Sequence, residues 1–278
     1  MCLNYTEFDD YLYVPSSTDF DIKNTLECGQ VFRYKVRDFG YTVYSLNHKA
    51  DIYCQNGGTK IFTKDKKYFI KYFDFSKDYA KIKASLSVYL ELKPAIEFGK
   101  GIRILNQSPL ETIVSFIISQ NNNIPRIKKI IEKICESYGE NMGDYYAFPT
   151  LQRLKEIPIE FFRSIGAGYR DKYLYETIQS IDCKIIDDIS NNMPTDLARR
   201  ELMKFKGVGR KVADCILLFG FGKTNVFPTD TWILKCYKNL FGVDLDDAIK
   251  ISNKFVERYK LLSGYAQQYL FYQMRENS

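Results

Sequence analysis

Hydrophobic and polar residues alternate in short runs over the first hundred positions. The alternation is clearest in VFRYKV, YTVYSL, DIYCQ and KIFTK, and turn-forming residues interrupt it at 38–40, 47–48 and 56–58. A period of two is typical of strands that bury one face. The pattern therefore predicts an antiparallel β-rich domain over residues 1–98.

Beyond about Pro94 the hydrophobic period changes to three and four residues. The apolar positions that show it first are Ile113, Phe116, Ile117, Ile127, Ile130, Ile131 and Ile134. This spacing predicts amphipathic helices, and prolines and glycines mark their ends. Because the two patterns do not alternate as β-α-β, we expect an α+β protein with a helical domain over residues 99–278.

The composition narrows the class of protein. Hydrophobic residues make up 45% of the 278 positions and aromatic residues 15%, which excludes disorder caused by low hydrophobicity. No apolar stretch approaches the about 20 residues of a membrane span. The start, MCLNYTEFDDYLYV, carries acidic residues where a signal peptide is basic. We expect an intracellular protein with no membrane partner.

Cysteine and histidine exclude several kinds of chemistry. The seven cysteines form no Cys-x-x-Cys pair, and His48 is the single histidine. Neither a disulfide framework nor a zinc or iron–sulfur site is predicted, and we assign no metal ligands. Catalysis must use lysine, carboxylate, hydroxyl or thiol.

Basic residues exceed acidic ones by 40 to 34, which gives a net charge of +6. The densest group contains only Glu201 as an opposing acid and consists of Arg199, Arg200, Lys204, Lys206, Arg210 and Lys211. Such a cluster is compatible with a polyanionic partner, although a moderate excess is also common without one.

This cluster lies in a predicted pair of helices joined by Gly207, Val208 and Gly209. The first helix is expected to begin at Pro194 and Thr195 and to bury the apolar face formed by Leu197, Leu202 and Phe205. A glycine turn that leads into a helix, here at Arg210, leaves backbone N–H groups free to bind a phosphate. From the hairpin alone, an ordinary helix–helix connection is an equally good interpretation.

Lys211 stands in the first turn of the second helix. The positive end of the helix dipole and the neighbouring cations both disfavour its ammonium form, which favours a reactive amine. Cys215 lies four residues further on, so its sulfur shares the same helical face and could accept the proton or a hydrogen bond. The alternatives are a solvated phosphate-binding lysine and a small buried cysteine.

Asp230 precedes the predicted helix that contains Trp232 and Ile233. As a helix cap it would remain anionic, because backbone N–H donors and the dipole favour the carboxylate. An anion beside a neutral amine is the pair needed to break a glycosidic bond: the anion stabilises positive charge on the sugar while the amine attacks it. Capping alone is the alternative role.

Five strings occur in one order over nearly the whole chain. They are CGQVFRY, SPLETIVSFIISQNNNIPRI, IGAGYRDKYL, GVGRKVADC followed by FPTD, and GYAQQYLF. Together they resemble the 8-oxoguanine DNA glycosylases of the helix-hairpin-helix, Gly/Pro-Asp (HhH-GPD) superfamily. A carboxy-terminal cysteine cluster, typical of the iron–sulfur branch, is missing.

The resemblance implies a bifunctional repair enzyme. Lys211 would be the Schiff-base nucleophile and Asp230 the essential carboxylate. The enzyme would flip 8-oxoguanine out of the duplex, displace it, and cleave the strand by β-elimination. Its partner would be double-stranded DNA with the lesion opposite cytosine, bound by a monomer in the cytoplasm, at the nucleoid in a bacterium. No cofactor is expected, although a structural cation on the hairpin carbonyls is an option.

The resemblance also assigns the base-recognition residues Gly29, Cys215, Gln267 and Phe271. The Gly29 carbonyl would accept the N7 hydrogen that distinguishes 8-oxoguanine from guanine. Leaving that acceptor unpaired costs about 1 to 3 kcal/mol, or about 5- to 150-fold, so this one bond cannot be the whole filter. From the residues alone, a turn glycine, a solvated Gln267 and a core Phe271 are favoured.

The remaining residues implied by the resemblance contact DNA: Asn121, Arg126, Tyr169, Arg170, Gly207, Val208, Gly209 and Trp232. Asn121 would fill the vacated stack, and the two arginines would hold the estranged cytosine. Considered alone, each arginine is better explained as a surface charge. Trp232 departs from the histidine of better-known members, so it could donate to phosphate but never become cationic.

Two other functions remain open from the sequence. A non-enzymatic helix-hairpin-helix module would bind DNA through phosphates and ignore the lesion. A glycosylase of the same superfamily for another damaged purine would not depend on Gln267.

Overall fold

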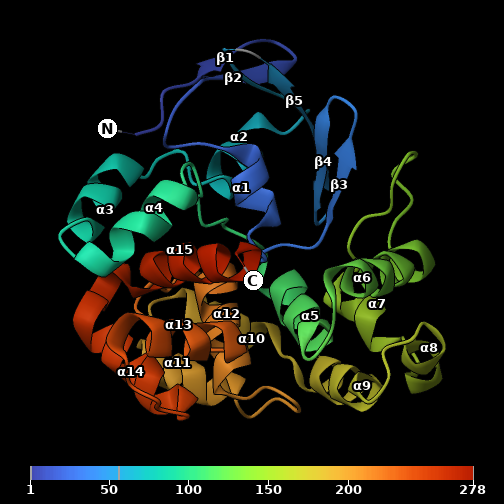
Figure 1. Cartoon of the computed structure of the whole chain (residues 1–278). Coiled ribbons are helices and arrows are strands. Elements are labelled where there is room, and N and C mark those ends of the chain that lie inside the picture. Colours follow the sequence, from blue (N-terminus) through green and yellow to red (C-terminus); the bar gives the residue numbers. More distant parts are fainter. Residues whose placement is uncertain (1, 56, 278) are drawn as a thin grey trace.

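The computed structural model describes residues 2–55 and 57–277 and confirms the α+β architecture. The sheet lies to one side, and the helices fill the rest of the molecule (Figure 1). Among the described residues, no helix is both long and apolar enough to cross a membrane.

The sheet contains six antiparallel strands in the order β1-β2-β6-β5-β4-β3. They are β1 (Thr6–Glu7), β2 (Tyr11–Pro15), β3 (Tyr34–Arg37), β4 (Gly40–Ser45), β5 (His48–Gln55) and β6 (Gly58–Phe62). Its register places Leu12 opposite Ile61, and Ile61 opposite Ile52. These three side chains are fully buried, so the alternating pattern did identify the inward face.

Helices also occur before residue 99, where the sequence pattern predicted mainly strands. They are α1 (Ile22–Glu27), α2 (Lys66–Tyr72), α3 (Tyr79–Leu86), the 3-10 helix η1 (Leu90–Leu92) and α4 (Lys93–Phe98). Phe69 and Tyr72 of α2 pack in the sheet core, whereas Tyr79 and Leu86 of α3 belong to the helical core. The two parts thus share packing, and the boundary between residues 98 and 99 stays a prediction.

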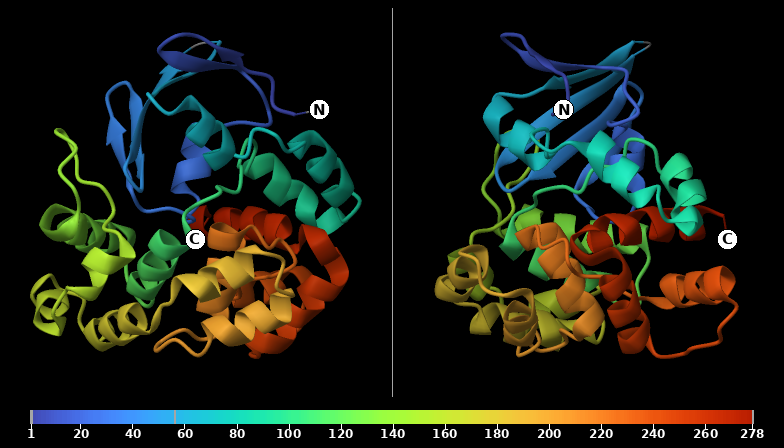
Figure 2. Two further views of the ribbon diagram at one scale, coloured as in Figure 1. Left: turned by 180° about the vertical axis from the view of Figure 1, so that it is seen from behind. Right: turned by 90° about the vertical axis from the view of Figure 1, so that its left-hand side faces the viewer.

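The helices after residue 99 are α5 (Pro109–Ser119), α6 (Ile124–Tyr138), α7 (Leu151–Lys155), α8 (Ile159–Ser164), α9 (Arg170–Ser180), α10 (Cys183–Ser190), α11 (Thr195–Leu202), α12 (Arg210–Phe221), α13 (Thr231–Phe241), α14 (Ala248–Tyr259), η2 (Lys260–Leu262) and α15 (Ser263–Glu276). The isoleucines that predicted α5 and α6 are at most 3% exposed. In both views of Figure 2, most of these helices lie below the sheet.

One predicted core position is wrong. Leu202 is fully buried and Phe205 is 8% exposed, but Leu197 is 48% exposed. Ala198, four residues before Leu202, takes the inward position of α11 instead, because residues four apart share a helical face. Leu197 is one residue out of phase and points to solvent.

The carboxy-terminal helix α15 joins the two parts. Gln268 Nε2 donates to the carbonyl oxygen of Cys28 at 2.8 Å, and the Tyr272 hydroxyl bonds to Asn24 Oδ1 at 3.0 Å. Figure 1 accordingly shows α15 between the amino-terminal segment and the other helices. The last helix therefore fixes residues 24–28 relative to the helical core.

Candidate active site

The hairpin between α11 and α12 has the geometry that its glycines require. Gly207 has φ +77°, and a Cβ there would overlap Cδ2 and Cγ of Tyr173. Gly209 is the N-cap of α12 and has no side chain to cap it, whereas Asp230 and Asp247 cap α13 and α14 through their carboxylates. Among the residues that the structure describes, no side chain caps the first amides of α12, so these amides suit an anion.

Behind the hairpin, a buried ion pair fixes α12 against α11. Arg199 Nε donates to Asp214 Oδ1 at 2.5 Å, and Arg210 Nη2 donates to Asn253 Oδ1 at 2.5 Å. Burial raises the pKa of Asp214, and the Arg199 charge opposes that rise. The basic cluster is thus partly structural: Arg199 is 7% exposed and unavailable to DNA.

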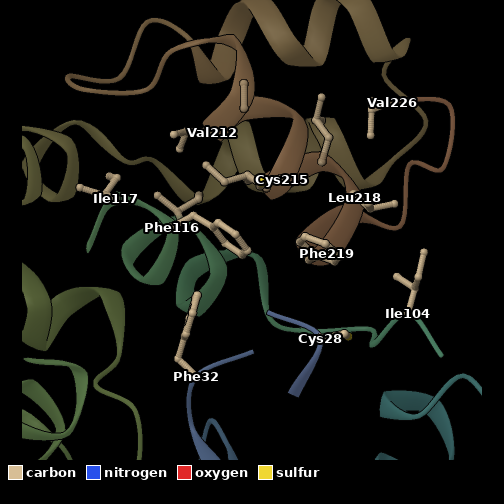
Figure 3. Packing of buried hydrophobic residues seen from close by; sticks show 14 of the residues in the cluster. Cys28, Phe32, Ile104, Phe116, Ile117, Val212, Cys215, Leu218, Phe219 and Val226 are labelled. Atoms are coloured by element: carbon tan, nitrogen blue, oxygen red, sulfur yellow. The ribbon is translucent and has the colours of Figure 1, made fainter. Parts of the chain in front are cut away.

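Lys211 lies half-buried at the start of α12, beside Cys215 and above an aromatic ring. Its Nζ is 5.8 Å from the centroid of Phe116 in α5. Figure 3 shows Cys215 and Val212 of α12 facing Phe116 and Ile117 of α5. Burial raises the pKa of the Cys215 thiol to about 11, opposed by the Lys211 charge and hydrogen bond. The thiol is protonated at neutral pH, so it can hydrogen-bond to the amine but cannot take up its proton.

Asp230 caps α13 as expected. Its Oδ1 accepts from the backbone N–H groups of Trp232 at 3.0 Å and Ile233 at 3.1 Å. Its charge acts on the Cys215 thiol in the direction opposite to that of Lys211. Lys211 and Asp230 therefore both lie close enough to the Cys215 sulfur to affect the pKa of its thiol, in opposite directions.

A second group contains three residues for which the sequence resemblance implies base recognition, Gly29, Phe271 and Gln267; we call it the base-reading set. Gly29 has φ +85°, and a Cβ there would lie 3.1 Å from Cε1 of Phe271. Gln267 is 5% exposed, and its Oε1 is buried with no hydrogen-bond partner among the described residues. From the residues alone, Gln267 was expected in solvent and Phe271 in the core. The structure shows the reverse, because the Gln267 amide is buried and Phe271 is only half-buried.

Aromatic packing connects the base-reading set to Lys211. Phe32, three residues after Gly29, meets Phe116 edge to face with centroids 5.7 Å apart. Phe116 in turn stacks on Phe219 of α12 at 5.5 Å. The segment that carries Gly29 and the helix that carries Lys211 therefore pack against the same ring.

Two loops bring together the residues assigned to the estranged base. Arg126 Nη2 donates to the Gly166 carbonyl at 2.8 Å, and the Tyr169 hydroxyl donates to the Gln120 carbonyl at 3.3 Å. Arg170 is 3% exposed and donates to the carbonyls of Gln120, Asn121 and Ala167. It holds the loop in which Asn121 adopts φ 45°.

Trp232 lies half-buried in the first turn of α13. Lys235 Nζ stands 4.8 Å from its ring centroid, so a cation lies next to the indole. Across residues 2–55 and 57–277, no group of three or more His, Cys, Asp or Glu side chains is arranged to hold a metal ion.

Sequence reasoning missed two residues of this site. Phe116 was identified only as a core position, and Arg275 was not identified at all. The signal for Arg275 was present, because residues 267, 271 and 275 follow one another at intervals of four on a single helical face.

A helix-hairpin-helix beside an amine–carboxylate pair defines the general class of this protein. A family described as "HhH-GPD superfamily base excision DNA repair protein" matches residues 114–261, and one described as "8-oxoguanine DNA glycosylase, N-terminal domain" matches residues 12–113. The chain belongs to the HhH-GPD superfamily and carries the amino-terminal domain of the 8-oxoguanine DNA glycosylases.

Individual proteins agree with this assignment. The crystal structure of the Clostridium acetobutylicum 8-oxoguanine glycosylase/lyase with double-stranded DNA containing cytosine opposite 8-oxoG is 39% identical. It superposes with a TM-score of 0.92 over 100% of this chain and 99% of that one. A probable N-glycosylase/DNA lyase of Methanothermobacter thermautotrophicus is 33% identical over 67% of each chain.

The eukaryotic relatives align over a smaller part of their length. The N-glycosylase/DNA lyase OGG1 of Arabidopsis thaliana is 34% identical over 62% of this chain and 52% of its own length. The Saccharomyces cerevisiae N-glycosylase/DNA lyase aligns over 43% of its length. The chain thus spans about half the length of these curated relatives.

Proposed function

We propose that this protein is a bifunctional DNA N-glycosylase and abasic-site lyase that excises 8-oxoguanine opposite cytosine. One observation carries the proposal: the buried Gln267 Oε1 has no partner among the described residues, and it lies four residues from a ring packed on Gly29. A buried acceptor without a donor costs about 1 to 3 kcal/mol, so a ligand is the expected donor.

The Watson–Crick edge of a guanine-type base supplies what Gln267 lacks. Its N1–H and exocyclic amine donate to an amide oxygen, while the Phe271 ring stacks on the plane of the base. The Gly29 carbonyl accepts the N7 hydrogen, and Cys215 covers the opposite face. The 39% identical Clostridium acetobutylicum protein is an 8-oxoguanine glycosylase/lyase, solved with double-stranded DNA that contains cytosine opposite 8-oxoG, which supports this substrate.

The proposed chemistry needs only Lys211 and Asp230. The neutral amine attacks C1′, and the bond from C1′ to the base breaks with its electron pair on the base. The base takes up the proton that the amine releases, and the Asp230 carboxylate stabilises the positive charge on the sugar. The adduct, which carries nitrogen and O4′ on C1′, then opens to an imine as the amine proton passes to O4′. Water takes up a proton from C2′, and the C3′–O bond breaks with its electron pair on the departing phosphate.

Cys215 lies four residues after Lys211 and shares its face of α12. The protonated Cys215 thiol adds a hydrogen-bonding partner without taking the proton. Neither step requires a cofactor in this proposal, and the hairpin carbonyls would be the place for a structural cation. All groups come from one chain, so a monomer suffices.

We assign DNA contacts to two surfaces. The uncapped amides after Gly207, Val208 and Gly209 would hold a phosphate, with Trp232 as a further donor. Arg126 and Tyr169 would face the estranged cytosine, and Asn121 would enter the vacated stack. Arg170 would contact the cytosine only after its guanidinium stops donating to the loop carbonyls. DNA as substrate implies the cytoplasm, and the nucleoid in a bacterium.

The test is excision and imine trapping on an end-labelled duplex with 8-oxoguanine opposite each of the four bases. We expect fastest excision opposite cytosine and a covalent adduct with borohydride. Lys211→Gln should lose the adduct and slow excision by at least about 10³-fold. Lys93→Gln, an exposed lysine of α4, is the matched control.

Three results would contradict the proposal. An equal adduct in Lys211→Gln would remove the nucleophile assignment. Salt-sensitive binding indifferent to the lesion, with no base released, would indicate a binding module. Release of an alkylated purine in preference to 8-oxoguanine would change the substrate.

A further inference from the structure

Arg275 lies on the same face of α15 as Gln267 and Phe271, at the third position of that spacing. Its side chain is 17% exposed, and Nη2 donates to the backbone carbonyl of Glu27. Nε donates to Glu276 Oε1 at 3.0 Å. These bonds fix the guanidinium across the segment that leads to Gly29.

The remaining end of the guanidinium stands directly beside Gly29. A Cβ on Gly29 would lie 2.8 Å from Nη1 of Arg275 and 3.1 Å from Phe271 Cε1. The guanidinium carbon is 5.6 Å from the centroid of the Phe271 ring. Within residues 2–55 and 57–277, Nη1 makes no hydrogen bond, in contrast to Nε and Nη2. A charged N–H donor therefore remains unpaired at the residue proposed to read N7.

The lesion has a second difference from guanine that the base-reading set does not use. Beside N7, 8-oxoguanine carries a carbonyl oxygen at C8, where guanine carries a hydrogen. Gln267 offers an amide to the Watson–Crick edge, Phe271 a ring and Gly29 an acceptor, so none of these donates to the C8 oxygen. The C8 oxygen is two bonds from N7, so a donor next to Gly29 would stand beside it when the Gly29 carbonyl meets the N7 hydrogen.

We infer that Arg275 is a specificity-determining residue whose Nη1 donates to the C8 oxygen of the flipped base. The inference rests on the proposed function. For guanine, the C8 hydrogen would face the guanidinium and leave it unpaired, at the same time as the Gly29 carbonyl would face the N7 lone pair. The fold discrimination against guanine from the two mismatches then multiplies, which supplies the selectivity that one hydrogen bond cannot.

The test compares 8-oxoguanine with 8-thioguanine, which keeps the N7 hydrogen but offers sulfur, a weak acceptor, at C8. Arg275→Met should slow single-turnover excision of 8-oxoguanine about 10- to 100-fold, the range for a hydrogen bond to a charged group. Excision of 8-thioguanine should change less than about 3-fold by the same reasoning. Cleavage of a ready-made abasic site, which needs no base contact, should stay at the wild-type rate.

Binding gives a second measurement that does not depend on turnover. Duplexes with 2′-fluoro nucleosides bind without excision, because fluorine destabilises positive charge on the sugar. The affinity ratio between the two lesions should shrink in Arg275→Met. Arg258→Met is the matched control, because Arg258 is a half-exposed arginine of α14 that pairs with Glu91 of η1.

The outcomes separate the two proposals. If wild-type protein neither excises 8-oxoguanine nor forms the imine, the proposed function fails. If wild type is active but Arg275→Met slows the excision of both lesions equally, Arg275 only holds the backbone at Glu27 and the inference is overturned. Unchanged excision of 8-oxoguanine would overturn it as well.

Discussion

Arg103 and Gln267 are both buried polar side chains, and they differ in what surrounds them. Arg103 is 0% exposed and lies between the sheet and the helices, where its guanidinium donates to the carbonyls of Phe73 at 2.9 Å and of Asp19 and Lys77 at 3.0 Å. Gln267 is nearly as buried, yet Oε1 has no partner among the described residues.

The difference separates architecture from function. A buried polar group that is fully bonded within the chain is a structural element, because every donor is committed in the free protein. A buried group left without a partner destabilises the free protein, so in a site proposed to take a ligand, the ligand is the expected partner. The same distinction places Gln268, which bonds to Cys28, with the architecture, and its neighbour Gln267 with the site.

The largest expected effect tests whether Asp230 acts through its charge or only as a cap. Asn caps helices as well as Asp does, so Asp230→Asn should leave the free energy of unfolding nearly unchanged. Excision of 8-oxoguanine should fall by about 10² to 10³-fold, because the anion that stabilises the sugar cation is lost. Urea unfolding and single-turnover excision measure the two. Asp247→Asn, the matching cap of α14, should change neither.

The next effect tests whether Arg103, the fully bonded buried residue, has a structural role. Arg103→Met should lower the free energy of unfolding by about 2 to 4 kcal/mol, since several buried carbonyls lose their donor. The excision rate per folded molecule should not change. Arg153→Met, which removes an arginine whose side chain is 55% exposed, serves as the control in urea unfolding. A loss of only a few tenths of a kcal/mol for Arg103→Met would contradict the structural role that separates Arg103 from Gln267.

A smaller effect distinguishes the two neighbouring glutamines. Gln267→Leu should slow 8-oxoguanine excision about 5- to 150-fold while leaving stability unchanged or raised, because an unpaired buried acceptor is removed. Gln268→Leu should instead lower stability by about 1 kcal/mol through the lost bond to Cys28. Both variants should cleave a ready-made abasic site normally. Equal destabilisation by the two would show that Gln267 is structural too.

A last effect, of similar size to that of Gln268→Leu, concerns the hairpin. Gly207→Ala should cost about 1 to 2 kcal/mol, because a side chain is strained at φ +77° and would also meet the Tyr173 ring. Gly209→Ala is the control: its φ is −82° and a Cβ there meets nothing within 4 Å. Thermal unfolding should show a loss for the first variant only, and duplex affinity should fall with it.

Local patterns were sufficient for the elements and for several roles. Period two identified the inward faces of the strands, and period three to four identified α5 and α6. Asp230 was predicted as a cap from its position before α13, and Gly207 as the turn. These features depend on neighbours within a few residues, so sequence alone expresses them.

Tertiary structure decided the features that join distant segments. The α3 helix packs with the helical core although it precedes residue 99, because long-range packing rather than local pattern sets core membership. Arg170 binds the loop carbonyls of Gln120 and Asn121, some 50 residues away, so it is not the surface charge that was favoured when it was considered alone. Arg199, a member of the basic cluster, is bound to the buried carboxylate of Asp214. The pairing of Arg275 with Gly29 was invisible for the same reason.

The sequence by itself determined which residues can supply an amine, an anion and an amide, since those are properties of side chains and of their spacing. Only the folded chain decided that Gln267 is buried and unpaired and that Arg275 stands beside Gly29. Burial and hydrogen-bond satisfaction depend on segments more than two hundred residues apart, and no local pattern encodes them.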